Sequence, residues 1–345
     1  MRILLTGHEG YIGAVMAPQL IAAGHDVVGL DSGLFTQCTF GDEPKPVKGI
    51  AKDVRDLVAG DLDGFDAILH LAGLSNDPLG DLNPGLTFDI NHLASVRMAE
   101  LAKQAGVKRY LFSSSCSNYG SGGDAFRTEE SELQPLTPYA ESKVRVERDV
   151  AKLADDDFSP VFLRNSTAYG VSPRMRFDLV LNNLVAWAFT TGRVLLKSDG
   201  TPWRPIVHIE DIGRAFIAVL DAPRETTHNL PINVGATKEN YQIRDIAEIV
   251  REAVPGSVVE FAEGASPDPR NYRVDFSRIE RLLPGFQPQW TARRGAQELV
   301  EAYRAVGLGR DEYEGPRYKR IAHLQRMMAE GRIDASLRWR SPQVA

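Results

Sequence analysis

Residues 6–13, Thr6-Gly7-His8-Glu9-Gly10-Tyr11-Ile12-Gly13, decide the fold of this chain. They follow the apolar residues 2–5 and open an amphipathic stretch over residues 11–23, so they join a buried strand to a helix. The three glycines permit a tight turn, a close approach of a diphosphate to the backbone, and close packing of the helix on the sheet. The free N–H groups at the helix start then bind phosphate oxygens. This GxxGxxG pattern directly after a strand predicts a dinucleotide site, and the alternative is a glycine-rich structural turn.

Four further apolar runs follow the loop, at residues 26–30, 47–51, 67–71 and 110–112. Between them lie helical patterns at 86–105 and 138–153, and such alternation with near-continuous apolar strands is typical of a parallel sheet covered on both faces. We therefore predict an α/β fold, a Rossmann-type doubly wound sheet with a smaller mixed α/β substrate-binding region. We predict a dinucleotide-binding domain over residues 1–165, to which a later segment at about 205–235 returns, and a mainly substrate-binding region over 166–310. Residues 311–345 form a predicted helical tail, which we expect to cover the surface or contact a partner.

The composition excludes several classes of protein. The 345 residues carry a net charge of −6, which argues against broad nucleic-acid binding, since that needs clustered Lys and Arg. Cys38 and Cys116 are too few for a disulfide framework and lack metal-ligand spacing, so no metal site is expected. The apolar residues 3–5 are too short for an export signal, and the stretch 179–189 contains two asparagines. We expect a cytoplasmic protein with no membrane partner.

Asp31 ends the second predicted strand, roughly 20 residues after the glycine loop. A carboxylate there accepts hydrogen bonds from the adenosine ribose and repels the 2′-phosphate of NADP, so NAD is favoured as the cofactor. The alternative is that Asp31 forms a turn before Ser32-Gly33.

Tyr139 and Lys143 lie four residues apart, on one face of the helix predicted after Pro138. An ammonium beside a phenol favours the phenolate, which can accept a proton from a sugar hydroxyl while hydride leaves the same carbon. The serine-rich stretch 113–120 ends the fifth predicted strand, at the edge where parallel sheets keep their sites. The pattern YxxxK alone is weak, and the alternative for each of these serines except Ser115 is a polar turn.

These motifs together resemble the extended short-chain dehydrogenase/reductase family, in its nucleotide-sugar epimerase/dehydratase branch, over about residues 1–305. The resemblance implies that Ser115, Tyr139 and Lys143 are catalytic, with Tyr139 as acid/base and Lys143 also contacting the nicotinamide ribose. It also implies a set of NAD-binding residues, namely Gly7, Gly10, Tyr11, Ile12, Gly13, Asp31, Asp53, Val54, Leu71, Ala72, Gly73, Asn91, Ser113, Tyr139 and Lys143. In the family, Asp53 and Val54 match an adenine-contacting pair, and Asn91 supports the strand motif of residues 70–73.

The resemblance implies a nucleotide-diphosphate sugar as substrate. Residues 200–211 match a family segment in which Arg204 would hold the diphosphate, His208 would brace the loop, and Asp211 would cap a helix. Arg270 would be a second phosphate ligand. The full set of implied substrate residues is Ser115, Ser117, Thr167, Asn183, Leu184, Arg204 and Arg270.

The departures from the family pattern narrow the chemistry. Dehydratases of this branch carry an Asp-Glu pair where this chain has Cys116 and Ser117, and decarboxylases usually keep a Glu at the second position. Both reactions are therefore disfavoured, and Cys116 is expected to be a buried packing residue. Thr167 stands where the family usually has Asn, so that part of sugar recognition differs.

The function predicted from these features is an NAD-dependent nucleotide-sugar 4-epimerase. The alternatives are an NAD(P)H-dependent ketoreductase of a nucleotide-linked 4-keto-6-deoxy sugar and a non-catalytic dinucleotide sensor or scaffold. The intact Ser115, Tyr139 and Lys143 disfavour the sensor. By resemblance we also expect a homodimer formed by the helices at 86–105 and 138–153.

Overall fold

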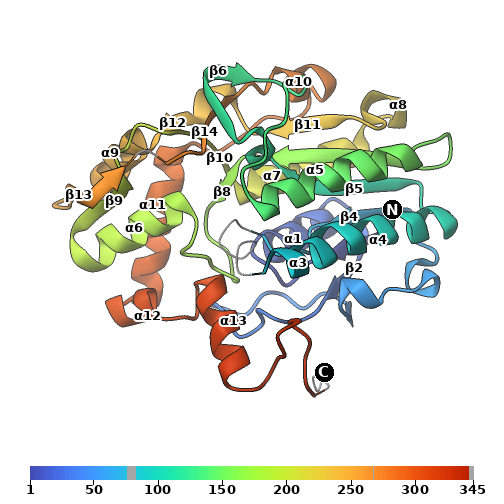
Figure 1. Ribbon diagram of the computed structural model, residues 1–345, viewed down its shortest axis with the longest axis horizontal. Helices are drawn as coiled ribbons and strands as arrows, with labels where there is room; N and C mark the ends of the chain where they lie inside the picture. The colour runs from blue at the N-terminus through green and yellow to red at the C-terminus, as the bar shows by residue number, and fades with distance from the viewer. Residues whose placement is uncertain (76–82, 267, 342–345) are drawn as a thin grey trace.

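The computed structural model describes residues 1–75, 83–266 and 268–341. At its centre lies a seven-stranded sheet in the order β11-β7-β5-β4-β1-β2-β3 (Figure 1). Every neighbouring pair in this sheet is parallel. The order reverses beside β1, which is the switch point of a Rossmann-type sheet, so the predicted fold class is confirmed. The strands are β1 (Arg2–Thr6), β2 (Asp26–Asp31), β3 (Gly49–Ala51), β4 (Ala67–His70), β5 (Arg109–Ser115), β7 (Ser159–Asn165) and β11 (Pro231–Val234).

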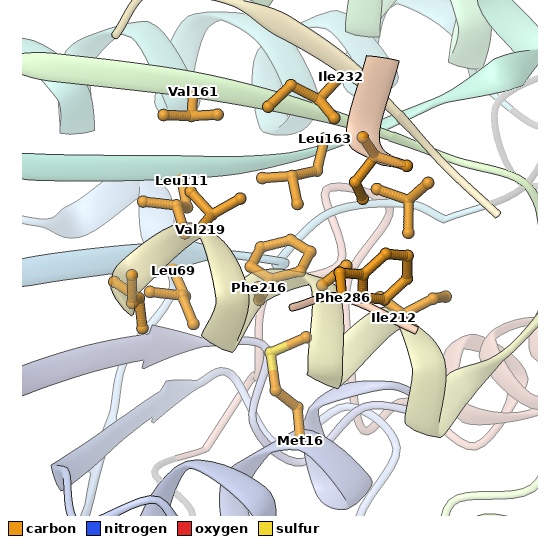
Figure 2. Packing of buried hydrophobic residues seen from close by; sticks show 14 of the residues in the cluster. Met16, Leu69, Leu111, Val161, Leu163, Ile212, Phe216, Val219, Ile232 and Phe286 are labelled. Carbon is orange, nitrogen blue, oxygen red and sulfur yellow. The ribbon is translucent and has the colours of Figure 1, made fainter. Parts of the chain in front are cut away.

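Two hydrophobic cores cover the two faces of this sheet, because residues in a strand point alternately to opposite sides. On one face, α1 (Gly13–Ala22) and α7 (Ile209–Asp221) pack on the strands and on each other. Figure 2 shows Ile212, Phe216 and Val219 of α7 lying against side chains of β4, β5, β7 and β11. On the other face lie α4 (Ala94–Gln104) and α5 (Pro138–Val150).

A second region lies beside the carboxyl edge of the sheet (Figure 1). It contains a sheet in the order β12-β10-β8 and the parallel pairs β13-β9 and β14-β6. A third core joins it to the loop after β1 through Tyr11, which is 4% exposed. The strands are β6 (Ser121–Arg127), β8 (Thr167–Tyr169), β9 (Arg193–Ser198), β10 (Trp203–His208), β12 (Asn240–Gln242), β13 (Val258–Ser266) and β14 (Asn271–Val274). The helices of this region are α6 (Val180–Thr191), α9 (Ile243–Ala253) and α11 (Ala292–Val306), whereas α8 (Arg224–Thr227) and α10 (Ser277–Leu282) lie beside β11 of the main sheet (Figure 1).

The chain then returns from this second region to the main sheet. After α12 (Arg310–Glu314), α13 (Arg320–Ala329) lies beneath the main sheet in Figure 1. Leu324, Met327, Ile333 and Leu337 of this segment are buried in the same core as α4 and α5. We call residues 316–341 the C-terminal strap. The strap therefore belongs to the main sheet by its packing, although the chain reaches it only after the second region.

The helix predicted at 86–105 is present, but it is not a regular α-helix throughout. The structure has α3 (Pro84–Thr87), a π-helical stretch η3 (Phe88–Leu93) and then α4. A π-helix adds one residue to the turn and shifts the faces of the helix on either side of it. Short 3₁₀ turns occupy η1 (Val54–Asp56), η2 (Ala59–Leu62), η4 (Cys116–Tyr119), η5 (Ala151–Leu153) and η6 (Thr237–Glu239).

Candidate active site

A cavity of about 1140 Å³ lies at the carboxyl ends of the main strands and extends into the second region. This volume lies just above the range of about 300–1,000 Å³ that is typical of pockets for one small molecule. Every residue that the sequence implied as a site residue lines this cavity, except Asn91. The lining set comprises Gly7, Gly10, Tyr11, Ile12, Gly13, Asp31, Asp53, Val54, Leu71, Ala72, Gly73, Ser113, Ser115, Ser117, Tyr139, Lys143, Thr167, Asn183, Leu184, Arg204 and Arg270.

The glycine loop after β1 forms one wall of the cavity, and two of its glycines have no room for a side chain. A Cβ on Gly13 would lie 2.1 Å from the carbonyl oxygen of Gly7. Gly7 itself has φ +74°, and a Cβ there would lie 2.9 Å from the backbone nitrogen of Ala72. The loop thus brings the N-terminus of α1 to the cavity surface, where its backbone N–H groups can bind a diphosphate. This cradle fits a dinucleotide.

Two carboxylates, Asp31 and Asp53, line the part of the cavity that follows strands β2 and β3. Asp31 accepts hydrogen bonds from the backbone N–H groups of Glu9 (3.1 Å) and Gly33 (2.9 Å), which fix it at the end of β2. Asp53 caps η1 and pairs with Arg55 at 2.7 Å. Burial raises the pKa of Asp53, but the hydrogen bonds and charge of Arg55 outweigh burial, so the pKa lies below its ordinary value. Asp53 is therefore held as an anion in this part of the cavity.

A buried hydrogen-bond chain supports the loop at residues 71–74. The hydroxyl of Thr6 accepts from the N–H groups of Leu71 and Ala72, so its own proton goes to Nδ1 of His70 (2.7 Å). Nε2 of His70 then donates to Ser95 (2.7 Å), which in turn donates to the carbonyl oxygen of Asn91. This chain requires a neutral imidazole, and burial lowers the pKa of His70 to about 3.

Asn91 lies outside the cavity and holds its wall from behind. Its Oδ1 accepts from the N–H of Leu74 (2.7 Å), and its Nδ2 donates to the carbonyl of Leu74 (2.9 Å) and to Ser142 on α5 (3.2 Å). Because Asn91 sits in the π-helical stretch η3, that irregular turn aims the amide at both partners. Its position matches a supporting residue rather than one that touches a ligand.

The serines at the end of β5 and in the turn η4 after it line the cavity, while Cys116 between them faces the core. Ser115 accepts from the backbone N–H (3.1 Å) and the hydroxyl (2.9 Å) of Ser117, and both side chains line the cavity. Cys116, between them, is 0% exposed, and its thiol faces the carbonyl of Arg164 in the core. Burial raises the pKa of Cys116 well above its ordinary value. The expectation that Cys116 is a buried packing residue is confirmed.

Tyr139 and Lys143 lie on the first turns of α5, whose N-cap Thr137 accepts from the N–H of Ala140. The Nζ atom of Lys143 donates to the carbonyl of Ser113 (2.7 Å) and lies 5.7 Å from the centre of the Tyr139 ring. Burial lowers the pKa of Lys143 to about 7, against the opposing effect of Glu147.

A buried ion pair anchors the back of this site. Glu147, one turn after Lys143, pairs with Arg164 of β7 at 2.6 Å, and both side chains are under 10% exposed. Glu147 also accepts from Ser114 (2.5 Å) and Asn118 (3.0 Å), the neighbours of the cavity serines. These bonds fix α5 against the end of β5, which sets the relative positions of Tyr139 and Ser115.

The substrate side of the cavity holds polar groups that are already paired. Asn183 on α6 donates to the carbonyl of Phe177 (2.7 Å) and to the hydroxyl of Tyr313 (3.0 Å). Arg204 on β10 pairs with Asp268 at 3.0 Å and donates to the carbonyl of Arg270. Arg270 also pairs with Asp268, at 2.7 Å. The two arginines therefore form a cluster around one carboxylate, and a diphosphate bound there would compete with Asp268.

His208 and Asp211 lie behind this wall. Nε2 of His208 contacts Glu298 at 2.9 Å and its ring stacks on Trp290, so the expected bracing role is confirmed. The expectation that Asp211 caps a helix is wrong, because α7 begins at Ile209 with His208 as its N-cap. Asp211 instead accepts from the backbone N–H groups of Gln289 and Trp290, which ties α7 to the loop before α11.

Other lining residues were not anticipated. Arg176 is 5% exposed, pairs with Asp178 at 2.9 Å and donates to Ser75. The strap also reaches the cavity, with Lys319, Arg320, Ile321, Ala322 and Leu337. The apolar residues Ile321, Leu324 and Met327 recur every third position, and this spacing was the available signal that the tail packs on the protein.

Within the described residues, no helix has the length and apolarity needed to cross a membrane. The same residues contain no group of three or more His, Cys, Asp or Glu side chains placed to hold a metal ion.

Comparisons with known proteins agree on one family. The profile described as "NAD dependent epimerase/dehydratase family" matches residues 3–235. The UDP-glucose 4-epimerase of Mycolicibacterium smegmatis is 28% identical over 319 residues, covering 88% of this chain and 99% of that protein. UDP-glucuronic acid decarboxylase 1 of Arabidopsis thaliana is 27% identical over 333 residues, covering 91% and 72%. The solved structure of MoeE5 in complex with UDP-glucose and NAD has a TM-score of 0.75 at 25% identity, covering 89% of this chain and 100% of that one. The similarity is thus nearly full-length and spans more than one reaction.

Proposed function

The chain belongs to the NAD-dependent epimerase/dehydratase family, and we propose that within this family it is a nucleotide-sugar 4-epimerase. It is an NAD-dependent enzyme, and the glycine loop provides the cradle that the cofactor needs. The observation that carries the proposal is that Ser115, Tyr139 and Lys143 line the same cavity as that loop, while the two positions after Ser115 carry no acid.

The chain's own groups supply the proton chemistry. The phenolate of Tyr139 accepts the proton of the sugar C4 hydroxyl, and Ser115 donates a hydrogen bond to the same oxygen. The ammonium of Lys143 favours the phenolate by its charge. When bound, NAD supplies the acceptor and then the donor of the C4 hydride. After the 4-keto sugar has turned over in the cavity, Tyr139 returns the proton to the opposite epimer.

The residues after Ser115 argue against dehydration and decarboxylation. Elimination of water from C5 and C6 needs an acid and a base beside the sugar, whereas Cys116 points into the core. Ser117 faces the cavity but bears a hydroxyl that donates to Ser115, so it offers no ionisable group for decarboxylation or dehydration. With no acid after Ser115, the proton chemistry that remains is the transfer at the C4 hydroxyl by Tyr139, which is what an epimerase needs.

The substrate is proposed to be a nucleotide-diphosphate sugar, with UDP-glucose as the first to be tested. MoeE5 binds UDP-glucose together with NAD, and the Mycolicibacterium smegmatis relative is named a UDP-glucose 4-epimerase. The arginine cluster of Arg204 and Arg270 around Asp268 lies in the cavity where a diphosphate would bind.

The test compares wild type with Tyr139→Phe on a panel of UDP-, dTDP-, CDP- and GDP-sugars without added cofactor. Wild type should interconvert C4 epimers with NAD that co-purifies, and Tyr139→Phe should lose about 10²–10⁴-fold in turnover while keeping its NAD. Tyr241→Phe, a tyrosine outside the cavity, is the matched control and should keep wild-type turnover. Turnover only with added NADPH, or near-normal turnover in Tyr139→Phe, would contradict the proposal.

A further inference from the structure

The C-terminal strap lines the cavity at both of its ends. Lys319 lies beside Tyr313, the partner of Asn183 on the substrate side, with its Nζ 4.8 Å from the Tyr313 ring centre. Arg320, Ile321 and Ala322 continue along the wall, and Leu337 reaches the end near Asp53 and Val54. One continuous segment therefore runs from the substrate side of the cavity to the part that follows β2.

The strap is held to the loop after β2 by several hydrogen bonds. Nε1 of Trp339 donates to the carbonyl of Ser32, the residue after Asp31, at 2.7 Å. Nε2 of His323 contacts the carbonyl of Leu34 at 2.9 Å. Because Asp31 ends β2, these bonds fasten the strap beside the carboxylate that marks the adenosine end of the cavity.

Charged contacts fasten the strap to η1 as well. The guanidinium of Arg338 lies 3.6 Å from Asp53 and also pairs with Asp56. In return, Arg55 donates to the carbonyl of Ser336 at 2.9 Å. Asp53 therefore has one arginine partner from its own turn and a second from the strap, and the strap helps to orient that carboxylate.

Leu337 adopts a backbone conformation that leucine normally avoids, with φ +57°. The left-handed region brings the Cβ of a residue with a side chain close to the following carbonyl oxygen, so the surroundings must hold Leu337 there. The side chain is 3% exposed, packs in the core with Val54, and also lines the cavity. Leu34 and Phe35 line the same part, so the surface there is apolar. Such a surface suits the flat apolar face of an adenine ring.

We propose that the C-terminal strap completes the adenosine subsite of the cofactor site, with Leu337 as a wall for the adenine, and that it controls how fast NAD leaves. The apolar face of adenine packs against Leu337 while the hydrogen bonds of Trp339 and Arg338 keep the strap closed. Release of the adenosine end then requires the strap to detach from Ser32 and Asp53. This inference rests on NAD binding and not on which sugar reaction follows.

The experiment measures the release of radiolabelled NAD chased by excess unlabelled NAD, with no sugar nucleotide present. Leu337→Gly removes the wall. Glycine adopts positive φ without strain, which offsets part of the stability lost with the buried leucine side chain, and thermal unfolding checks that the variant is folded at the temperature of the assay. Its NAD dissociation rate should rise about tenfold, since a buried leucine contact is worth at least one decade of affinity. Trp339→Phe, which loses only the hydrogen bond to Ser32, should show a smaller rise.

Asn229→Gly is the matched control, because Asn229 also has positive φ (54°) but does not line the cavity. Its NAD dissociation rate should equal that of wild type. The affinity of Leu337→Gly for ADP-ribose should fall, while its affinity for nicotinamide mononucleotide should not change. Unchanged NAD release in both strap variants would overturn the proposal. Equal loss for both fragments would also overturn it, because the strap would then act on the whole fold and not on the adenosine subsite.

Discussion

His70 is a buried histidine whose partners leave no place for a second proton. Nδ1 accepts the hydroxyl proton of Thr6, and Nε2 donates to Ser95, so a charged imidazole would break the bond to Thr6. That hydroxyl also accepts the N–H groups of Leu71 and Ala72 in the cavity wall. The protonation state of one ring thus bears on the shape of the cofactor site.

The pH dependence of stability should show this residue. The pKa of His70 is about 3 in the fold, against an ordinary value of 6.5, so the unfolded chain binds more protons between these values. The free energy of unfolding should therefore fall as the pH is lowered from 6.5 to 3, by up to about 1.4 kcal/mol per pH unit from this group. Below the folded pKa the effect ends.

Denaturant unfolding of wild type and His70→Gln at several pH values measures this contribution. Glutamine can accept a hydrogen bond from Thr6 and donate one to Ser95 without titrating. The free energy of unfolding of the variant should therefore change less steeply with pH than that of wild type between pH 3 and 6.5. Between pH 7 and 9 the two slopes should agree, which serves as the control. Parallel slopes across the acid range would show that His70 does not titrate as described.

Single residues also show what local sequence can predict. Ser115 lines the cavity and Cys116 lies in the core, as expected, but the change of direction comes from the 3₁₀ turn that begins at Cys116 and not from the alternation of a strand. Asp211 was misassigned because an acidic residue near a helix start resembles a cap, while its partners, the N–H groups of Gln289 and Trp290, lie about 80 residues later. Contacts of that separation leave no local signal.

The loop between β1 and α1 is the element on which both the fold and the cofactor depend. Gly13→Ala would place a Cβ against the carbonyl of Gly7, a backbone atom that cannot move without displacing the loop. We expect the variant to lose about 1–3 kcal/mol of stability and most of its NAD affinity. Thermal unfolding and NAD titration measure the two effects.

Gly285→Ala is the matched control, since a Cβ at that position meets nothing within 4 Å. It should change stability by no more than about 0.5 kcal/mol and leave NAD binding unchanged. If Gly13→Ala retained wild-type NAD affinity, the close packing of the loop on α1 would not be needed for the site.

Elements differ in how far the sequence predicts them. The buried strands β1, β2 and β4 were located within one or two residues because a strand covered on both faces is continuously apolar. The π-helical turn Phe88–Leu93 was missed, because its residues keep a helical pattern and only the packing of Asn91 reveals the extra residue. The strap was expected to cover the surface, and the distant contact of Trp339 with Ser32 shows where it lies.

At the scale of the whole molecule, we expect a homodimer formed through α4, α5 and the adjoining η3. Leu93, at the end of η3, is 58% exposed and stands where such an interface would cover it. Leu93→Glu should weaken dimerisation, because it would bury a charge in the interface. Sedimentation equilibrium should give about twice the chain mass of 38.0 kDa for wild type and a lower mass for the variant.

Val258→Glu is the control for this experiment, since Val258 is equally exposed (57%) but lies on β13 in the second region. It should leave the mass at that of the dimer. A monomeric wild type, or a Leu93→Glu variant that remains fully dimeric, would contradict an interface at these helices.

The strap also gives the protein a distinct order of assembly during translation. A ribosome adds roughly 5–20 residues per second, so Leu337 is polymerised roughly 15–65 s after Gly7. Tyr139, Lys143 and the glycine loop are therefore synthesised before the strap that lines the same cavity. A product of premature termination before residue 316 would carry every proposed catalytic residue and yet hold its NAD loosely. Full-length synthesis would thus be a condition for keeping the cofactor.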